Sequence, residues 1–284
     1  MTDNEEQWDL EIKPKSSILY IDFAEIWRYR DLMLLFVRRD FVALYKQTIL
    51  GPVWHFIQPI LTSIMFLIVF SRIAKLPTDG IHPIVFYLSG VTLWNYFSVC
   101  LNNISNTFVS NANIFGKVYF PRIVTPLSIL ISNLVKFGIQ FLLLITTMIW
   151  FSFNGYPISI SFNWLLIPFI LLLIGGITLG LGIIVSSLTT KYRDFTVLLT
   201  FAVQLLMYGT PIVYPLSYLK QQGFGWIVRL NPLTPIVESF RYALFGKGTF
   251  TYIDILYSFG FMMIVLFIGV ILFNKIEKSF IDTV

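Results

Sequence analysis

The chain has 284 residues, of which 56% are hydrophobic and only 12% are charged. Soluble domains are about 45–50% apolar and about 25% charged, so this composition predicts an integral membrane protein and excludes an ordinary soluble fold. The net charge of +5 lies mostly in loops and in the N-terminal segment. No basic stripe is interleaved with stacking aromatic residues, so membrane topology and anionic lipid explain the charge better than a nucleic acid does.

The sequence offers little for catalysis or for metal binding. Cys100 is the single cysteine, and His55 and His82 are far apart, so neither a disulfide framework nor a metal site is expected. The phosphate loop, the nucleophile elbow and the HExxH motif are all missing from the sequence. We therefore expect a chain that catalyses nothing alone and carries no cofactor of its own.

Residues 1–50 are predicted to be a cytoplasmic segment that contains one amphipathic helix. Over Ala24–Lys46, helical spacing gathers cations on one side and Ile26, Tyr29, Met33 and Phe36 on the other. This pattern predicts an interface helix on the inner leaflet, although an amphipathic helix packed on protein would show the same pattern. Gly51 and Pro52 should end it. The interface-helix cations are Arg28, Arg38, Arg39 and Lys46.

Residues 51–284 are predicted to form a transmembrane domain of about six helices, because a span needs about 20 apolar residues. The runs are continuous rather than alternating, which favours helices over barrel strands and gives an all-α integral membrane protein. The expected spans are 53–71, 83–101, 123–151, 164–188, 195–214 and 255–273. Most lysines and arginines outside them fall on one set of loops, so the positive-inside rule places both termini in the cytoplasm.

The segment between the second and third spans, "NANIFGKVYFPRIVTPLS" (Asn111–Ser128), is predicted to be cytoplasmic. Its first part mixes amides, cations and three aromatic residues that we expect to be exposed. A short helix over about residues 108–121 would suit docking into a groove of another protein. The alternative is a segment anchored at the membrane interface by its aromatics. The candidate docking residues are Asn111, Asn113, Phe115, Lys117, Tyr119, Phe120, Pro121 and Arg122.

Two further features concern charge. In "KYRDF" (Lys191–Phe195), Arg193 and Asp194 could make a second cytoplasmic contact, or the cations could simply hold a loop inside. Asn133, Lys136 and Gln140 share one face of the third span. A lysine at membrane depth is a functional candidate, on a polar path or a subunit interface. The alternatives are a pairing within the bundle and snorkelling.

The glycine-rich run "GGITLGLG" (Gly175–Gly182) lies inside a span, so its small-residue spacing predicts close helix packing rather than nucleotide binding.

Residues 215–250 are too broken for a span and too apolar for a free loop. We expect either short re-entrant helices in the outer leaflet or a compact outer loop with an aromatic belt. In this region Glu238 and Arg241 are three residues apart and could pair on a short helix.

Five blocks, in order, resemble the type-2 permeases of ATP-binding-cassette exporters, in the branch that exports O-antigen, capsule or teichoic acid polysaccharides. They cover about Phe36 to Leu244, most of the chain. The blocks are "RRDFVALYKQTILGPVW" with the following Gln-Pro, "NANIFGKVYFPRIVTPLS", "KYRDF", "GTPIVYP" and "LNPLTPIVESFR".

The resemblance implies a homodimeric channel with two copies of a separate ATPase, which would bind ATP and Mg. The segment at about Asn111–Pro121 would then be the coupling helix, and about Leu216–Phe245 would be outer re-entrant helices. The cargo would be a polysaccharide, lipid-linked in our interpretation, exported across the bacterial cytoplasmic (inner) membrane. Candidate path residues are Trp54, Phe56, Phe66, Lys136, Tyr208 and Tyr214; outer-region candidates are Asn231, Pro232, Glu238 and Arg241.

Three alternatives stay open at the level of sequence. The same architecture could export a lipid or a drug. A membrane glycosyl or acyl transferase would need a carboxylate or histidine constellation near a membrane face, but Asp254 and Glu238 stand alone in the sequence. A structural scaffold would have no ATPase partner.

Overall fold

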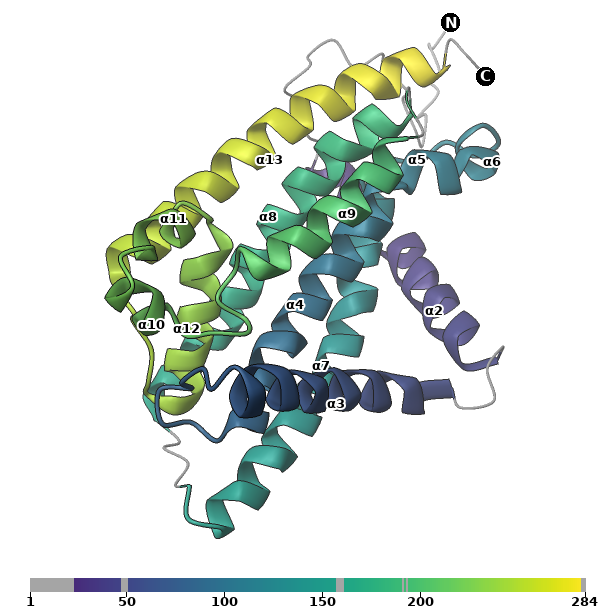
Figure 1. Cartoon of the computed structure of the whole chain (residues 1–284). Helices are drawn as coiled ribbons and strands as arrows, with labels where there is room; N and C mark the ends of the chain where they lie inside the picture. The colour runs from purple at the N-terminus through teal and green to yellow at the C-terminus, as the bar shows by residue number, and fades with distance from the viewer. Residues whose placement is uncertain (1–22, 47–50, 157–160, 191, 193, 282–284) are drawn as a thin grey trace, which may run out of the picture.

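The computed structural model describes residues 23–46, 51–156, 161–190, 192 and 194–281 (Figure 1). Within these ranges the chain is helical and has no β-strand, which confirms the all-α fold class. The long helices are α3 (Trp54–Phe66) with its π-helical continuation η2 (Leu67–Ile73), α4 (Pro83–Ser105), α7 (Val124–Phe153), α8 (Leu166–Thr189) and α13 (Tyr252–Ile281).

Shorter helices connect or flank the long ones. On the N-terminal side are α1 (Phe23–Arg28), α2 (Arg30–Lys46) and η1 (Gly51–Val53); between α4 and α7 are α5 (Thr107–Ser110) and α6 (Ala112–Phe115). A single 3-10 turn, η3 (Phe162–Leu165), precedes α8. The remaining helices are α9 (Phe195–Tyr208), α10 (Leu216–Gln221), α11 (Gly225–Arg229) and α12 (Leu233–Phe245).

Five helices of the described chain are long and apolar enough to cross a membrane. They match five of the predicted spans, with ends that differ by a few residues. The sixth prediction, 195–214, is wrong in its extent, because α9 has 14 residues and ends at Tyr208. At about 1.5 Å per residue, α9 is about 21 Å long, less than the roughly 30 Å of a bilayer core. Pro211 and Pro215 cannot donate the next helical hydrogen bonds.

Helix α4 is the centre of the bundle. It packs on α3, α7, α8 and α9, and most of its length is buried, including Tyr87, Phe97 and Ile104. Its neighbour α8 lies between α4 and α13, as Figure 1 shows. This arrangement leaves only one narrow side of α4 partly exposed.

The glycine-rich run of α8 allows two helices to approach closely. A Cβ on Gly180 would lie 2.8 Å from backbone atoms of Val265 and Leu266 in α13, and a Cβ on Gly182 would lie 2.6 Å from Ile104 in α4. Side chains larger than hydrogen do not fit at these distances. The packing interpretation of "GGITLGLG" is therefore confirmed.

The predicted interface helix corresponds to α1 and α2. Helix α2 packs on α7, and Phe36 is buried. Arg28, Arg38, Arg39 and Lys46 are exposed, as the amphipathic pattern predicted. Part of its apolar side thus covers protein. A lipid-facing role for the remainder, which includes the exposed Leu34 and Leu35, stays a prediction.

Residues 215–250 form the short helices α10, α11 and α12, as predicted. Helix α12 is buried over nearly its whole length and ends at Gly246, whose φ of 64° is the left-handed cap conformation that glycine favours. It packs on α8, α13 and α4. Helix α12 is therefore part of the packed core, whereas most of α11 is exposed, and the depth of the region in a membrane stays a prediction.

Candidate functional site

The segment between α4 and α7 forms two short helices and a turn. Asn111 separates α5 from α6, and its side-chain amide donates to the carbonyl oxygen of Thr107 at 2.9 Å. In Figure 1 this segment projects from the same end of the molecule as the last turns of α13. Two short helices therefore replace the single coupling helix expected over residues 108–121.

The aromatic residues of this segment point inward, contrary to the expectation that all three would be exposed. Phe115 and Phe120 are buried, and only Tyr119 is exposed, at 51% of its surface. Ring centroids lie 5.9 Å apart for Phe108 and Phe115, 5.6 Å for Phe115 and Phe120, and 5.8 Å for Phe120 and Phe36 of α2. The apolar rings leave water by packing on one another. This burial was not predicted, because the residues next to these aromatics in the sequence are polar.

This chain of rings reaches α13, because Phe108 also lies 5.0 Å from Phe273. We call Phe36, Phe120, Phe115, Phe108 and Phe273 the aromatic chain. Pro121 and Arg122 are buried beside it, with the Arg122 guanidinium 5.5 Å from the centre of the Phe115 ring. These two docking candidates therefore help to hold the segment in place.

The outward surface of the segment is smaller than predicted. Asn113 and the run Gly116–Tyr119 are exposed. The Tyr119 hydroxyl lies 3.5 Å from a carboxylate oxygen of Glu25 in α1, at the limit of a hydrogen bond. We call Asn113 and Gly116–Tyr119 the exposed run. It offers an amide, a cation and an aromatic ring to a partner.

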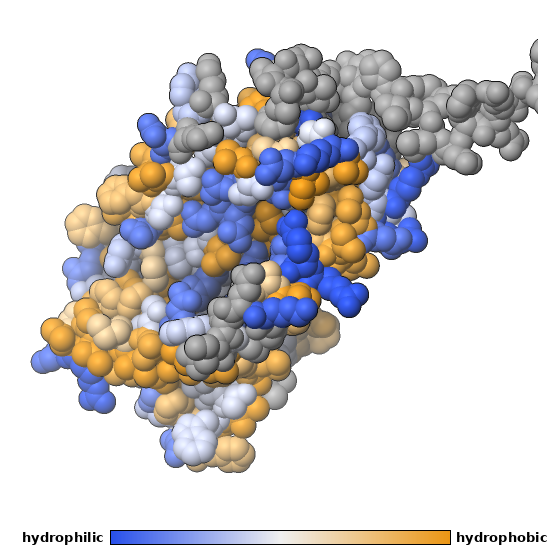
Figure 2. All heavy atoms as spheres, turned by 90° about the vertical axis from the view of Figure 1, so that its right-hand side faces the viewer, coloured by the Kyte–Doolittle hydropathy of each residue, from blue (hydrophilic) through white to orange (hydrophobic). Residues whose placement is uncertain are grey.

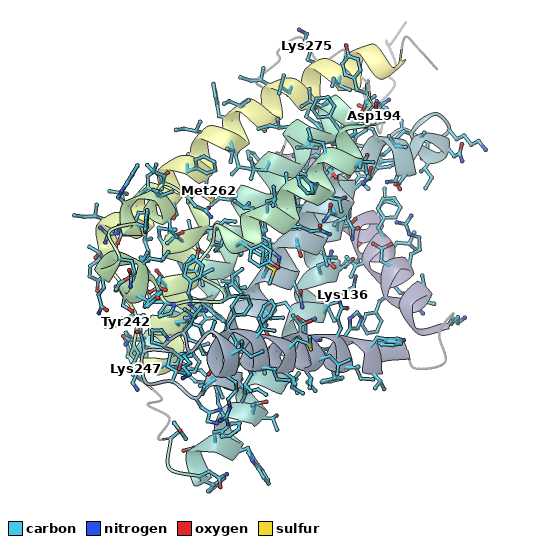
Figure 3. The ribbon with its side chains drawn as sticks, viewed as in Figure 1. Lys136, Asp194, Tyr242, Lys247, Met262 and Lys275 are labelled. Carbon is cyan, nitrogen blue, oxygen red and sulfur yellow. The ribbon has the colours of Figure 1, made fainter. Side chains whose placement is uncertain are left out.

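The second cytoplasmic candidate lies near the first. Arg193 falls outside the described residues, whereas Asp194 is exposed immediately before α9 (Figure 3). The Thr196 hydroxyl of α9 donates to the Asn106 side-chain oxygen at 3.2 Å, and the Thr189 hydroxyl donates to the Ser105 carbonyl oxygen at 2.7 Å. These bonds tie the turn between α8 and α9 to the end of α4, where α5 begins.

Asn133, Lys136 and Gln140 share one face of α7, as predicted. The Lys136 ammonium donates to the Asn133 side-chain oxygen at 2.9 Å, and Asn95 of α4 donates to Gln140 at 3.3 Å. Asn133 and Gln140 are buried, and Lys136 is half-buried. His55 of α3 lies within electrostatic range of Lys136. The group therefore joins three helices within the bundle.

Other polar residues of α4 were missed at the level of sequence. Asn95, Ser98 and Asn102 of α4, and Asn106 directly after it, recur every three or four residues, and all are half-buried. Amides at helical spacing within an apolar span were the available signal. They form a polar line between the Lys136 group and α9.

The aromatic path candidates are spread over two exposed helices. Trp54 and Tyr208 are exposed, whereas Phe56, Phe66 and Tyr214 are half-buried. Within the described chain, the only pair of the six path candidates joined by a hydrogen bond or ring contact is Tyr214 and Tyr208, whose hydroxyl-to-carbonyl distance is 2.6 Å. Helices α3 and α9, which carry most of them, both pack on α4 and leave large apolar side chains uncovered.

We call the four outer candidates, Asn231, Pro232, Glu238 and Arg241, the outer clasp; Glu238 and Arg241 are buried, and Asn231 and Pro232 are half-buried. Glu238 and Arg241 are each 2% exposed, and Glu238 Oε1 lies 3.5 Å from Arg241 Nη1, which confirms their predicted pairing. Arg241 donates to the carbonyl oxygens of Pro211 and Ile212 and lies 3.7 Å from the centre of the Phe86 ring. Burial lowers the pKa of the Arg241 guanidinium, and the Glu238 carboxylate opposes that change.

The rest of the clasp fixes both blocks of the outer region. Glu238 Oε2 accepts from the backbone N–H of Thr249 at 3.0 Å, and Oε1 accepts from that of Leu216 at 3.4 Å. The Asn231 side chain donates to Gly209 and Thr210 and accepts from the N–H of Leu233. Pro232 accepts from the Ser258 hydroxyl at 2.7 Å. Hydrogen bonds from Asn231 and Arg241 therefore hold the segments "GTPIVYP" and "LNPLTPIVESFR" together.

The clasp and the Lys136 group do not resemble a catalytic centre. Among the described residues, no group of three histidine, cysteine or acidic side chains could hold a metal ion. Lys220, at the end of α10, has its pKa lowered by burial and by Arg229, but no nucleophile or base lies in hydrogen-bond contact with it in this part of the chain.

Comparison with known proteins places the chain in a family. Residues 31–245 match the family model described as ABC-2 type transporter. The chain is 32% identical to an O-antigen export system permease protein, RfbA, of Klebsiella pneumoniae, over 89% of this chain and 94% of that protein. It is 24% identical to RfbA of Myxococcus xanthus, over 76% and 81%. It is also 24% identical to the polysialic acid transport protein KpsM of Escherichia coli, over 82% and 89%. The chain belongs to the ABC-2 type transporter family, and is thus a multi-pass membrane subunit that works with an ATP-binding subunit.

Proposed function

We propose that the chain is the channel-forming permease subunit of an ATP-driven exporter that moves a polysaccharide out across the bacterial cytoplasmic membrane. One observation carries this proposal: the chain aligns with an O-antigen export permease over 94% of that protein's length. A polysialic acid transport protein aligns over a similar extent, so the relatives share export of a glycan although the glycans differ.

Two copies of the chain would enclose the channel. Helices α3 and α9 support this arrangement, because apolar residues such as Leu61, Met65, Leu198 and Phe201 are exposed on them. Contiguous exposed apolar surface marks a lipid or protein contact. The polar line of α4 lies between the two helices and would face the cargo. Both termini would be cytoplasmic.

A separate ATPase, carrying ATP and Mg, would dock on the exposed run. Hydrolysis would displace the segment, and the bundles would move as rigid bodies. The exposed run supports this role because it presents Lys117 and Tyr119, whereas Phe115 and Phe120 are buried in the permease itself. Asp194 lies on the turn that hydrogen bonds tie to the end of α4, and would form the second contact.

The test is co-purification of the tagged permease with its ATPase, together with measurement of polymer at the cell surface. We expect wild type to retain the ATPase and the double variant Lys117→Ala/Tyr119→Ala to lose it while inserting normally. The matched control is Lys75→Ala, which removes an exposed cation near the other end of the bundle.

A wild-type chain that retains no ATPase would overturn the proposal. If the ATPase is retained and a lipid or drug is exported, but no polysaccharide reaches the surface, the chain is still a transporter subunit. The assignment of polysaccharide as the cargo is then wrong.

A further inference from the structure

Asn106 lies at the break between α4 and α5. Its backbone leaves the helical conformation, so α4 ends at Ser105 and α5 begins at Thr107. Thr107 and its neighbour Phe108 are fully buried, and Phe108 belongs to the aromatic chain. A displacement of the segment between α4 and α7 therefore reaches Asn106 directly.

The Asn106 side chain has both ends of its amide occupied. Its N–H donates to the carbonyl oxygen of Asn102 at 2.9 Å, and its oxygen accepts from the Thr196 hydroxyl of α9 at 3.2 Å. One bond needs the nitrogen and the other needs the oxygen, so the two together fix the orientation of the side chain. Asn106 thus links the end of α4 to the start of α9, which lies beside α5 in Figure 1.

Thr196 differs from Thr200, the next threonine of α9, in its hydrogen-bond partner. The Thr200 hydroxyl donates to the carbonyl oxygen of Thr196, one turn earlier in the same helix, at 3.0 Å. Thr196 is the second residue of α9, so no turn of its own helix precedes it. Its hydroxyl is therefore available to another helix, and it bonds to Asn106.

The end of α4 is tied to two helices that differ in how firmly they are packed. The Thr189 hydroxyl of α8 donates to the carbonyl oxygen of Ser105 at 2.7 Å, and α8 is buried along much of its length between α4 and α13. Of the residues of α9, all of which are described, only Val203 is buried. A helix with few buried contacts is displaced more easily, because fewer contacts must be broken. A movement at Asn106 is therefore expected to shift α9 rather than α8.

We propose that Asn106 and Thr196 are positioning residues that transmit the movement of the segment between α4 and α7 to α9. This inference rests on the proposed function, in which an ATPase displaces that segment and α9 borders the channel. The face that carries α2 and this segment is hydrophilic in its middle and hydrophobic around it (Figure 2), which suits contact with a soluble partner. Loss of the hydrogen bond should leave ATP hydrolysis intact and uncouple it from export.

The experiment uses the complex of the full chain with its ATPase. We measure retention of the ATPase in co-purification, the rate of ATP hydrolysis in nanodiscs, and polymer at the cell surface per permease inserted in the membrane. Thr196→Val replaces the hydroxyl by a methyl group. We expect it to retain the ATPase and its hydrolysis rate but to lower polymer export about fivefold or more, the lower end of typical coupling between sites.

Further variants test whether the hydrogen bond carries this effect. Thr196→Ser keeps the hydroxyl and should restore export. Asn106→Ala removes the acceptor, and adding Thr196→Val to it should lower export no further, because both changes remove the same bond. Thr200→Val, one turn along α9, removes a hydroxyl that bonds within its own helix and should export like wild type. If Thr196→Val does not fold, Asn106→Ala alone gives the same comparison.

Normal export by a folded Thr196→Val, or additive losses in the combined variant, would overturn the proposed role of the bond. Loss of the ATPase from Thr196→Val, or a parallel fall of hydrolysis and export, would show a structural role only and would overturn it as well. Failure of the wild-type chain to retain an ATPase or to export polysaccharide would instead overturn the proposed function, in a protein whose Asn106 and Thr196 are unchanged.

Discussion

The segment Thr107–Arg122, between α4 and α7, and the outer segment Gly209–Phe245 share several residue types but differ in what they expose. Both join transmembrane helices and mix proline, amides, cations and aromatics. In the outer segment the charged pair Glu238 and Arg241 is buried, and each side chain also makes hydrogen bonds to the backbone. In the segment between α4 and α7 the rings of Phe115 and Phe120 are turned inward and the exposed run is turned outward. The charged groups of the outer segment are thus bound within the chain itself, whereas the segment between α4 and α7 leaves polar groups exposed.

The largest expected effect is in the outer clasp. Arg241→Met leaves the Glu238 carboxylate buried without its cation, and removal of one partner of a buried pair costs about 3–5 kcal/mol of folding free energy. We expect a severe loss of folded protein, measured by size-exclusion yield and thermal denaturation in detergent. Arg241→Met/Glu238→Leu should recover part of the loss. A fully stable Arg241→Met would show that the clasp does not hold the outer region together.

A comparable effect is expected in the aromatic chain. Phe115 is 6% exposed and contacts the rings of Phe108 and Phe120. Truncation of a buried phenylalanine to alanine costs about 3–5 kcal/mol, so Phe115→Ala should lower the melting temperature markedly. Val118→Ala, on the exposed run of the same segment, is the matched control and should melt like wild type. Similar melting of the two variants would contradict the burial described here.

Asn231 should give an intermediate effect. Its side chain makes three hydrogen bonds: two hold the turn after α9, and the third accepts from the N–H of Leu233 at the start of α12. A typical intramolecular hydrogen bond contributes about 0.5–1.5 kcal/mol, so Asn231→Ala should destabilise by roughly 1–3 kcal/mol in the same melting assay. Asn163→Ala, near the start of α8, serves as a control. If both variants lost equally little, the Asn231 bonds would not matter for stability.

The smallest effect on stability is expected at Tyr119. Its exposed ring covers little of the protein, so Tyr119→Ala should change the folding free energy by less than about 0.5 kcal/mol. Retention of the ATPase, by contrast, should fall sharply if the exposed run is the docking surface. If Tyr119→Ala unfolded the permease, the prediction of a small effect on stability would be wrong. If it kept the ATPase at wild-type level, Tyr119 would not belong to the docking surface.

The spans and the fold class were predictable because hydropathy over about 20 residues depends on local sequence alone. The pairing of Glu238 with Arg241 was also predictable from helical spacing. The inward orientation of Phe115 and Phe120 was not, because it depends on Phe36 and Phe273, which are distant in sequence. Their burial depends on tertiary packing, whereas the polar neighbours Asn113 and Lys117 favoured a prediction of exposure.

The extent of α9 and the polar line of α4 were missed for different reasons. Apolar residues continue through Ile212 and Val213, so the hydropathy predicted a longer span. The helix ends at Tyr208, because Pro211 cannot donate a helical hydrogen bond. The spacing of the amides in α4 was visible in the sequence. Their hydrogen-bond partners Gln140 and Thr196 were not predictable, because they come from the packing of α7 and α9.

The aromatic chain makes the segment between α4 and α7 stiff. Packed rings resist independent displacement, because a shift of one would open voids beside the next. Phe36, Phe115 and Phe273 belong to α2, to α6 and to α13, which are far apart in sequence. A force on the segment between α4 and α7 is therefore transmitted to α2 and α13, so the segment moves with the bundle rather than as a flexible tether.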